Sequence, residues 1–461
     1  MKKYVLISLA IMIALPVMAK GGLTANAMDY LREAVKNNTQ TKAMARAIQA
    51  APLDKLATDR KESNVPKVFT HVMKHVRVTN QARSGRCWLF AGLNVLRPVV
   101  IKKYKLDNFE FSYNYLFFYD KLEKANLFLE SMINLAKKPV TDREVGFLLK
   151  SPCGDGGQWN MVVDLAAKYG LVPLYAMPET EQSHNTRYMN VVIKRLLRKG
   201  AGTLRNAINA GKTEKEVEQV KLDILRQVYR VLALSLGTPP TRFVWRYKPK
   251  KGKPPKPVAM TPKKFYRKIV GTRLEKFVYL ADVPVHPYMK AYQVKYDRDM
   301  QDRPNMLFVN VPAKIMEAAA RKAVMKDIPV WFGADVGKSD VKRRGWLKID
   351  AMDMGALFGV DLKMSKKDFM TYGDSIPTHA MVLVGVDIIN KKVNKWLVQN
   401  SWGTKYGEKG YWTMTKKWFD TFVYAVIVPK SVVPKKVLKA LAEKPTILPP
   451  WDPMYKAIHM N

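Results

Sequence analysis

The apolar positions of the chain have helical spacing in its first two thirds and form strand-like runs near its end. The helical spacing predicts helices over 28–35, 41–50, 191–205 and 214–236. Farther on, 381–386 is an uninterrupted apolar run typical of a buried strand, and 395–398 is a second strand candidate. Residues 390–394 between them have the composition of a turn. We therefore expect a hairpin that brings residue 400 back toward residue 379.

A short apolar helix is predicted directly after Cys87. Leu89 and Leu93 fall on one face of this helix, and Pro98 predicts its end or a kink. Gly85, just upstream, permits the tight backbone approach that places Cys87 at the helix start. Because a helix N-terminus carries partial positive charge, we expect it to lower the pKa of this thiol.

Four side chains of this sequence together supply the chemistry of a cysteine hydrolase. A thiol attacks as a thiolate, and a free Cys has a pKa of about 8.5, so Cys87 needs a base such as the imidazole of His379. The side-chain oxygen of Asn400 could accept a hydrogen bond from that imidazole and fix its tautomer. The amide of Gln81 could stabilise the oxyanion, a role whose loss costs about 10²–10³ in rate. Trp402 would cover the His379–Asn400 hydrogen bond and exclude water.

The other cysteine and the other histidines lack a comparable context. Cys153 has no partner motif, and we interpret it as a structural thiol. A Cys87–Cys153 bridge would destroy the nucleophile, so both thiols are expected to be free. The other histidines are scattered without the spacing of a metal site: His71, His75, His184, His286 and His459. We expect no metal and no organic cofactor.

The motifs of this chain resemble those of a known family. The run 81–91 around Cys87 is accompanied by further motifs at 155–159, 329–333, 357–361, 378–382 and 451–454. Over about 43–454 the chain resembles the papain-like cysteine peptidases of the bleomycin hydrolase and bacterial aminopeptidase C branch. The resemblance implies Cys87 as nucleophile, His379 as base, Asn400 as its orienting partner and Gln81 as oxyanion donor, with Trp88 beside the nucleophile.

The resemblance also implies an α+β fold, with a helical lobe, a β-rich lobe and a large helical insertion. After a signal peptide the expected order is an N-terminal arm, the catalytic helical lobe, the insertion, the β-rich lobe and a C-terminal arm: 1–19, 20–80, 81–180, 181–320, 321–430 and 431–461. In this branch the insertion builds a homohexamer whose active sites face an inner channel. The implied substrates are therefore peptides.

The resemblance implies that the C-terminal end determines which peptides are cut. In the family the chain ends in the active-site cleft, where a terminal carboxylate pairs with the free amine of the substrate and makes the enzyme an aminopeptidase. Here seven residues follow Met454, Tyr455 stands where the family commonly has Gly, and Asn461 ends the chain. A longer tail leaves two alternatives open, a cysteine endopeptidase and a dipeptidyl peptidase with the same triad.

The chain is strongly basic. Lys and Arg number 79 against 39 Asp and Glu, a net charge of +40, with the densest basic stretch at 246–257. Such an excess attracts polyanions and acidic substrates. An alternative function is therefore a polyanion- or nucleic-acid-binding scaffold with dispensable peptidase activity. A weak polyanion-binding surface beside the peptidase is also consistent with this charge.

The first residues have the pattern of an export signal. Lys2 and Lys3 precede an apolar core at 5–15, and small residues follow at 17–19. The core is shorter than the roughly 20 apolar residues of a membrane anchor, although an uncleaved anchor stays open. We therefore expect a periplasmic or secreted enzyme with no stable membrane insertion after cleavage.

Overall fold

The structure, a computed structural model, describes residues 21–35, 38–59, 66–74, 77–271, 274–338, 340–341 and 344–454. The predicted signal peptide (1–19), His75 and the tail 455–461, with His459 and Asn461, lie outside the described residues. No helix in the described ranges is both long and apolar enough to cross a membrane. The chain separates into two compact units, Met1–Ala57 and Thr58–Asn461.

The first unit contains three short helices, α1 (Ala25–Arg32), α2 (Thr39–Ala50) and α3 (Leu53–Ala57). Two of them have side-chain caps, because Thr24 and Asn38 accept hydrogen bonds from backbone amides in the first turns of α1 and α2. These two helices overlap the stretches predicted as helical at 28–35 and 41–50.

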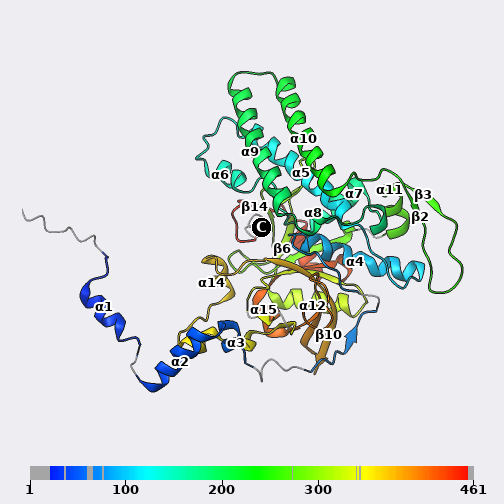
Figure 1. Cartoon of the computed structure of the whole chain (residues 1–461). Helices are drawn as coiled ribbons and strands as arrows, with labels where there is room; N and C mark the ends of the chain where they lie inside the picture. Colours follow the sequence, from blue (N-terminus) through cyan, green and yellow to red (C-terminus); the bar gives the residue numbers. More distant parts are fainter. Residues whose placement is uncertain are drawn as a thin grey trace, which may run out of the picture. The chain divides into compact units, whose positions relative to one another are not determined.

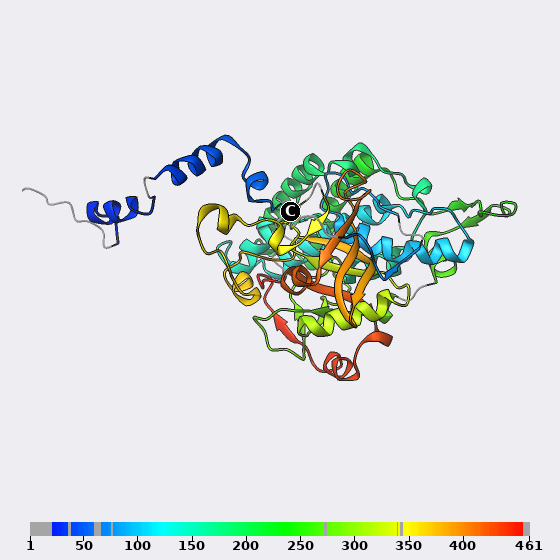
Figure 2. The ribbon, with the colours of Figure 1, turned by 90° about the horizontal axis from the view of Figure 1, so that it is seen from below.

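In the second unit, a large sheet has helices packed on both of its faces (Figures 1 and 2). The helices on the side that carries Cys87 are α4 (Cys87–Tyr104), α5 (Tyr113–Asn134), α6 (Arg143–Lys150), α7 (Trp159–Tyr169), α8 (Glu181–His184), α9 (Arg187–Asn209), α10 (Glu214–Leu236) and α11 (Pro262–Phe265). The remaining helices are α12 (Ala313–Val324), α13 (Met354–Phe358), α14 (Lys366–Thr371), α15 (Lys416–Phe422) and α16 (Lys435–Leu441). Of these, α12, α15 and α16 contribute to the hydrophobic core on the opposite face.

The sheet has the order β14-β5-β6-β4-β13-β7-β10-β11-β12-β9-β8, with β1 also paired to β10. Its strands are β1 (His71–Val72), β4 (Phe277–Ala281), β5 (Lys290–Val294), β6 (Leu307–Asn310), β7 (Val330–Ala334), β8 (Asp340–Val341), β9 (Trp346–Leu347), β10 (His379–Ile389), β11 (Lys392–Gln399), β12 (Tyr411–Thr415), β13 (Val423–Pro429) and β14 (Thr446–Leu448). A separate hairpin consists of β2 (Phe243–Trp245) and β3 (Val258–Met260).

Strand β10 is buried on both faces, which explains its uninterrupted apolar sequence. Val382 and Val384 belong to the core that contains α4, whereas Met381 and Leu383 belong to the core that contains α12. Alternate side chains of a strand point to opposite faces, so a strand covered on both sides needs apolar residues at every position. The sequence prediction of a buried strand is confirmed here.

The predicted hairpin is also confirmed. Strands β10 and β11 pair antiparallel, from Ile389 opposite Lys392 to Val382 opposite Gln399. Asn390 and Lys391 form the two-residue turn with positive φ angles of 50° and 64°, the geometry that matches the twist of paired strands. The hairpin returns the end of β11 to the level at which β10 begins.

Helix α4 differs from the prediction at Pro98, where an end or a kink was expected. The helix continues past Pro98 to Tyr104, so the expected end is wrong. A proline inside a helix costs about 3 kcal/mol or more. Residues 88–97 are buried without interruption, and tertiary packing of this kind overrides local helix propensity.

The stretch 181–320, predicted as a helical insertion, contains both helices and strands. Helix α10 spans Glu214–Leu236, as predicted, and begins with a capping box between Thr213 and Glu216. The structure differs from the prediction in that β4, β5 and β6 join the large sheet. These strands were not predicted because periodicity alone cannot distinguish a short apolar strand from a buried helical segment.

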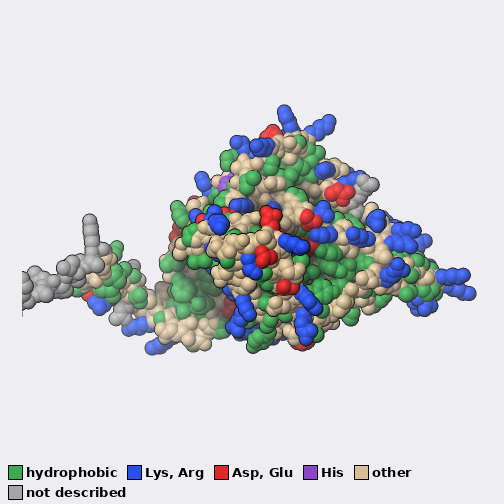
Figure 3. All heavy atoms as spheres, turned by 90° about the horizontal axis from the view of Figure 1, so that it is seen from above, with side chains coloured by type: hydrophobic (Ala, Val, Ile, Leu, Met, Phe, Trp, Pro, Cys, Tyr) green, Lys and Arg blue, Asp and Glu red, His purple; other side chains and the backbone are tan. Residues whose placement is uncertain are grey.

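Basic side chains are spread over the surface. Figure 3 shows Lys and Arg over much of the visible face, with fewer acidic side chains among them. The basic stretch 246–257 connects β2 to β3, and most of its residues are exposed. In this stretch the Lys250 Nζ lies 3.2 Å from the Asp107 Oδ1.

Two buried carboxyl groups lie in the loop after β5. Asp297 and Asp299 are both 0% exposed, and neither carboxyl has a hydrogen-bond partner among the described residues. Burial raises the pKa of both well above the usual range. For Asp299 the neighbouring Asp120 raises the pKa further, and Lys124 opposes the shift. We therefore expect both carboxyls to be protonated in the folded protein.

Replacing Asp299 by Asn should stabilise the protein increasingly as the pH rises. The wild type loses stability as the pH rises from the unfolded pKa of Asp299 toward its raised folded pKa, because folding then requires proton uptake. Asn has no such requirement, so the difference should grow by about 1 kcal/mol per pH unit over this window. Urea unfolding at several pH values measures it. Asp302→Asn, at a largely exposed carboxylate, is the control, and a pH-independent difference for Asp299→Asn would contradict the prediction.

Candidate active site

Cys87 is the first residue of α4, and its position is fixed by the buried side chain of Arg86. The guanidinium donates to the Ser84 hydroxyl at 2.9 Å and to the Ser183 carbonyl at 2.6 Å. It also lies 2.8 Å from a carboxylate oxygen of Glu179. Arg86 is 0% exposed, so these partners compensate a charge that has no access to water. The loop before Cys87 is thereby attached to the segment around α8.

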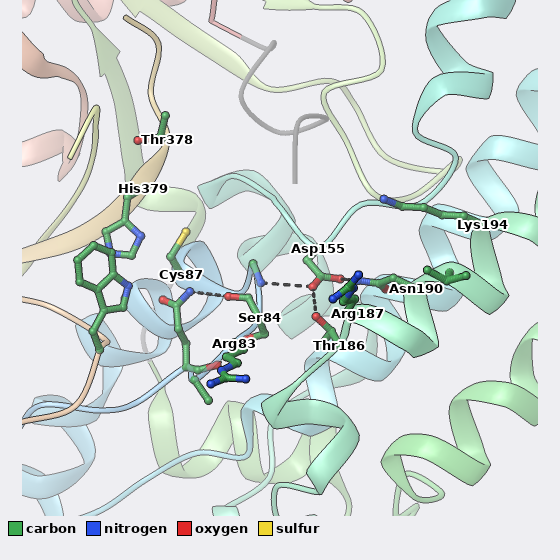
Figure 4. A pocket seen from close by; sticks show the side chains of 15 residues that line it. Arg83, Ser84, Cys87, Asp155, Thr186, Arg187, Asn190, Lys194, Thr378 and His379 are labelled. Atoms are coloured by element: carbon green, nitrogen blue, oxygen red, sulfur yellow. Dashed lines mark hydrogen bonds between the residues drawn. The ribbon is translucent and has the colours of Figure 1, made fainter. Parts of the chain in front are cut away.

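The hairpin places His379 beside Asn400. His379 is the first residue of β10, Asn400 directly follows β11, and the His379 Nε2 lies 2.8 Å from the Asn400 Oδ1. The backbone N–H of Ser401 donates to the same atom at 2.7 Å. Since two donors converge on Oδ1, this atom is the carbonyl oxygen of the amide and His379 Nε2 carries the proton. His379 Nδ1 is then the nitrogen that can accept a proton, and the ring and the Cys87 sulfur lie toward one another in Figure 4.

Gln81 has its side-chain amide held at both ends. Its Oε1 accepts from the Ser401 hydroxyl at 2.6 Å, and its Nε2 donates to the Ser84 carbonyl at 2.6 Å. A side-chain amide has two N–H hydrogens, and the contact to Ser84 uses one of them. Gln81 also lines the cavity that contains Cys87. The remaining N–H can therefore serve an oxygen bound in that cavity.

Trp402 covers the imidazole. The ring centroids of Trp402 and His379 are 4.6 Å apart, and Trp412 contacts Trp402 edge to face at 5.5 Å. The backbone of Trp402 forms an isolated bridge with Asn80. Trp402 therefore lies against the His379 ring, and its coverage of the His379–Asn400 hydrogen bond stays a prediction.

Trp88 packs behind Cys87. Its indole N–H donates to the Asp155 carbonyl at 2.8 Å, and its own carbonyl accepts from the Trp331 indole at 3.1 Å. Gly157 lies directly on the Trp88 ring, where a Cβ would stand 2.5 Å from a ring carbon. The sequence Gly156-Gly157 thus leaves the space that the indole occupies.

The carboxylate of Asp155 is fully engaged beneath the cavity. It lies 2.6 Å from the Lys121 ammonium and accepts from Thr186 at 2.5 Å and from Asn190 at 2.8 Å. The backbone N–H of Gly85 donates to it at 3.3 Å. Burial disfavours its ionisation, but Lys121 and these hydrogen bonds hold its pKa well below the usual range. Asp155 is therefore a structural anion that links α5, α9 and the loop before Cys87.

The pKa of the Cys87 thiol differs from the expectation. Burial raises this pKa above its usual value, while backbone amides of Ala380, Trp88 and Cys87 oppose the shift. The amides at the helix start act in the predicted direction, but desolvation of the half-buried thiol outweighs them. The thiolate therefore depends on a partner that takes the proton, and His379 is the base in reach.

Two hollows converge on Cys87 and His379. The larger one has a volume of about 620 Å³ and is bounded by the loop at Gln81, by Trp402 and by one face of α9. The smaller one, of about 40 Å³, is bounded by Gly157, Tyr279, Trp331 and Pro377. Both hollows are lined by Gly85, Cys87, Thr378 and His379, and their other lining residues differ.

The remaining candidates lie outside this arrangement. Cys153 is a free thiol, 1% exposed, as the structural interpretation expected. His71 and His286 each lie beside an aspartate, Asp327 at 3.0 Å and Asp452 at 2.7 Å. Asn461 is outside the described residues.

Sequence reasoning missed the residues that hold the site together. Ser401 contacts both Gln81 and Asn400, and Arg86 fixes the loop before the nucleophile. Ser401 directly follows Asn400 in the sequence, but its role appears only when two loops more than 300 residues apart meet. No local pattern carries that information.

Comparison with known proteins finds similar proteins over most of the chain. The Peptidase C1-like family model matches residues 22–455. An Aminopeptidase C from Lactobacillus delbrueckii subsp. lactis is 40% identical over 382 residues, 82% of this chain and 85% of that protein. The Bleomycin hydrolase of Homo sapiens is 38% identical over 400 residues, covering 83% and 88%. A crystal structure of PepW from Lactobacillus rhamnosis matches with a TM-score of 0.91 and 35% identity, covering 95% of this chain and 99% of that chain.

The rate at which Cys87 is alkylated should show whether deprotonation of its thiol depends on His379. Because burial raises the thiol pKa, His379→Ala should shift the pH at which iodoacetamide reacts with Cys87 to more alkaline values than in the wild type. Mass spectrometry of the Cys87 peptide measures the rate. Cys153 in the same sample is the internal control, since it is buried and should react slowly in both proteins. Identical pH profiles for Cys87 in the two proteins would show that the imidazole does not take its proton.

Proposed function

The chain belongs to the Peptidase C1-like family and is a cysteine peptidase with a papain-like fold, and from this premise we propose that it is an aminopeptidase acting on peptides with free N-termini. The observation that carries the proposal is that His379 lines the same cavity as Cys87 and has its Nε2 2.8 Å from the Asn400 Oδ1. Relatives named Aminopeptidase C support the aminopeptidase activity.

The proposed reaction begins with proton transfer from the Cys87 thiol to His379 Nδ1. The sulfur then attacks the scissile carbonyl carbon, and the carbonyl oxygen becomes an oxyanion. The Gln81 side chain and the Cys87 backbone N–H donate to this oxygen, which is consistent with the way Ser84 and Ser401 hold the Gln81 amide.

The second half of the reaction uses the same base. His379 returns its proton to the leaving amine, the C–N bond breaks, and the acyl group stays on Cys87 as a thioester. A water molecule that gives its proton to His379 attacks the thioester carbon, and the C–S bond breaks. The hydrogen bond to Asn400 keeps the imidazole in the required tautomer through both steps.

We propose that the C-terminal arm restricts cleavage to the N-terminal end of a peptide. The arm is anchored as far as Met454, which is 0% exposed, and the side chain of Asp452 lies 2.7 Å from His286. The Arg143 guanidinium lies over the Trp451 ring at 4.0 Å. An anchored arm supports a terminal carboxylate at Asn461 that pairs with the substrate ammonium.

Paired fluorogenic substrates test the aminopeptidase. The wild type should cleave an amide with a free N-terminus and leave the N-blocked counterpart intact. Cys87→Ala should lower kcat by about 10³-fold or more, because no nucleophile remains. Cys153→Ala is the matched control and should keep the activity.

The other outcomes separate the alternative functions. Thiol-dependent cleavage of the blocked substrate would make the protein an endopeptidase. Release of two residues at a time would make it a dipeptidyl peptidase. Absence of Cys87-dependent cleavage, with salt-sensitive retention on an anionic polymer, would favour the binding scaffold.

Removing residues 455–461 should weaken the requirement for a free N-terminus in the substrate. Without the terminal carboxylate at its proposed position, the truncated enzyme should cleave the N-blocked substrate, and its preference for the free amine should fall by roughly tenfold or more. The ratio of kcat/KM for the two substrates measures the effect. A truncated enzyme with the wild-type ratio would refute the carboxylate as end-stop.

A further inference from the structure

The larger hollow of the active site has a cationic wall. Arg187, Asn190, Val191 and Lys194 line it from α9. Their spacing of three, four and seven residues places them on one face of the helix. Arg83 faces the same hollow from the loop before Cys87. The wall therefore presents three cationic side chains, labelled in Figure 4, on the approach to the nucleophile.

None of these three cations forms a salt bridge within the part of the chain that the structure describes. Arg187 has its guanidinium over the ring of Tyr188, 5.6 Å from the centroid. Lys194 is half-buried, and burial together with the charge of Lys121 lowers its pKa. An ammonium held partly away from water without a counter-ion is stabilised by an incoming anion.

Asp155 does not neutralise this wall. It is the acidic residue that lines the hollow, but its carboxylate already serves Lys121, Thr186 and Asn190. It is also 4% exposed. The described residues that line this hollow therefore carry a net positive charge.

The smaller hollow, which shares Cys87 and His379 with the larger one, is lined by a different kind of residue. Glycines, Tyr279, Trp331 and Pro377 contribute to its lining, and the described residues that line it include no Asp, Glu, Lys or Arg. Its volume of about 40 Å³ is small beside the 620 Å³ of the cationic hollow. The two hollows thus differ in charge and in size.

We propose that the cationic hollow binds the part of the peptide after the scissile bond and selects an acidic residue directly following the cleaved bond, with Lys194 and Arg187 as specificity-determining residues. This inference rests on the proposed aminopeptidase function. The substrate ammonium would be repelled by Arg83, Arg187 and Lys194, so the N-terminal residue belongs on the neutral side. The remainder of the peptide then occupies the larger hollow, where a carboxylate is attracted.

Tetrapeptide amides test this selection. The substrates are Ala-Glu-Ala-Ala-NH2 and Ala-Gln-Ala-Ala-NH2, which differ by one charge and carry no C-terminal carboxylate. The wild type should cleave the Glu peptide with a kcat/KM roughly tenfold above that of the Gln peptide. In Lys194→Gln and in Arg187→Gln this ratio should fall toward one, and release of free alanine measures it.

Lys199→Gln is the matched control, because Lys199 lies on the same helix, is exposed and does not line the hollow. It should keep the wild-type ratio. Taking the Glu-to-Gln ratio within each variant cancels any loss of folded enzyme. A wild-type ratio of one or less, or a ratio that survives both substitutions, would overturn the proposal.

Two further outcomes have separate meanings. If Glu-Ala-Ala-Ala-NH2 is preferred over Gln-Ala-Ala-Ala-NH2 while the second position shows no preference, the hollow binds the N-terminal residue and the assigned side is wrong. If Cys87→Ala cleaves the Gln peptide as well as the wild type does, the proposed function itself fails. Cleavage of both peptides at equal rates, dependent on Cys87, rejects the selection alone.

Discussion

The site depends on the junction of two distant loops, in which the Ser401 hydroxyl donates a hydrogen bond to the Gln81 side chain. One loop leads into the helix that begins at Cys87, and the other follows the strand that ends beside Asn400. The Gln81 backbone N–H also donates to the Ser401 carbonyl at 2.8 Å. This junction holds Cys87 and His379 near one another. Such positioning of reacting groups lowers an activation barrier by several kcal/mol.

Two buried charged side chains stabilise the loop that leads to Cys87. Asp155 and Arg86 are both buried, and each has several charged or hydrogen-bonding partners. A buried charge without partners costs several kcal/mol, whereas a satisfied one specifies a single arrangement of its neighbours. The opposite case occurs at Asp299, where burial without partners favours the protonated carboxyl.

Much of the site could be predicted because its residues stand in strong local patterns. The helix after Cys87 and the hairpin between His379 and Asn400 follow from apolar runs and a turn. The continuation of α4 past Pro98 could not be predicted, because it depends on the burial of residues 88–97, which overrides the local cost.

The raised pKa of Cys87 also has a non-local cause. A sequence shows the helix start, whose amides lower the thiol pKa, but not the burial that raises it more. The cationic wall of α9 is similar, since the residues look like an ordinary solvated helix face until the fold places them beside Cys87. What escaped prediction is therefore what depends on contacts between distant segments.

The buried Arg86 has a consequence for the modular nature of this fold. Its guanidinium lies over the rings of Phe90 and Phe117, at 5.2 Å and 5.1 Å, and its ionic and carbonyl partners, Glu179 and Ser183, lie at the border of the segment predicted as an insertion. The partners of Asp155 on α9 belong to the same segment. Excising that segment to obtain a minimal peptidase would leave Arg86 paired with Glu179 and Asp155 paired with Lys121. It would remove the hydrogen bonds that Ser183, Thr186 and Asn190 make to these two buried charges. The segment is thus an integral part of the body that carries Cys87, because two buried charges next to that residue take part of their hydrogen bonding from it.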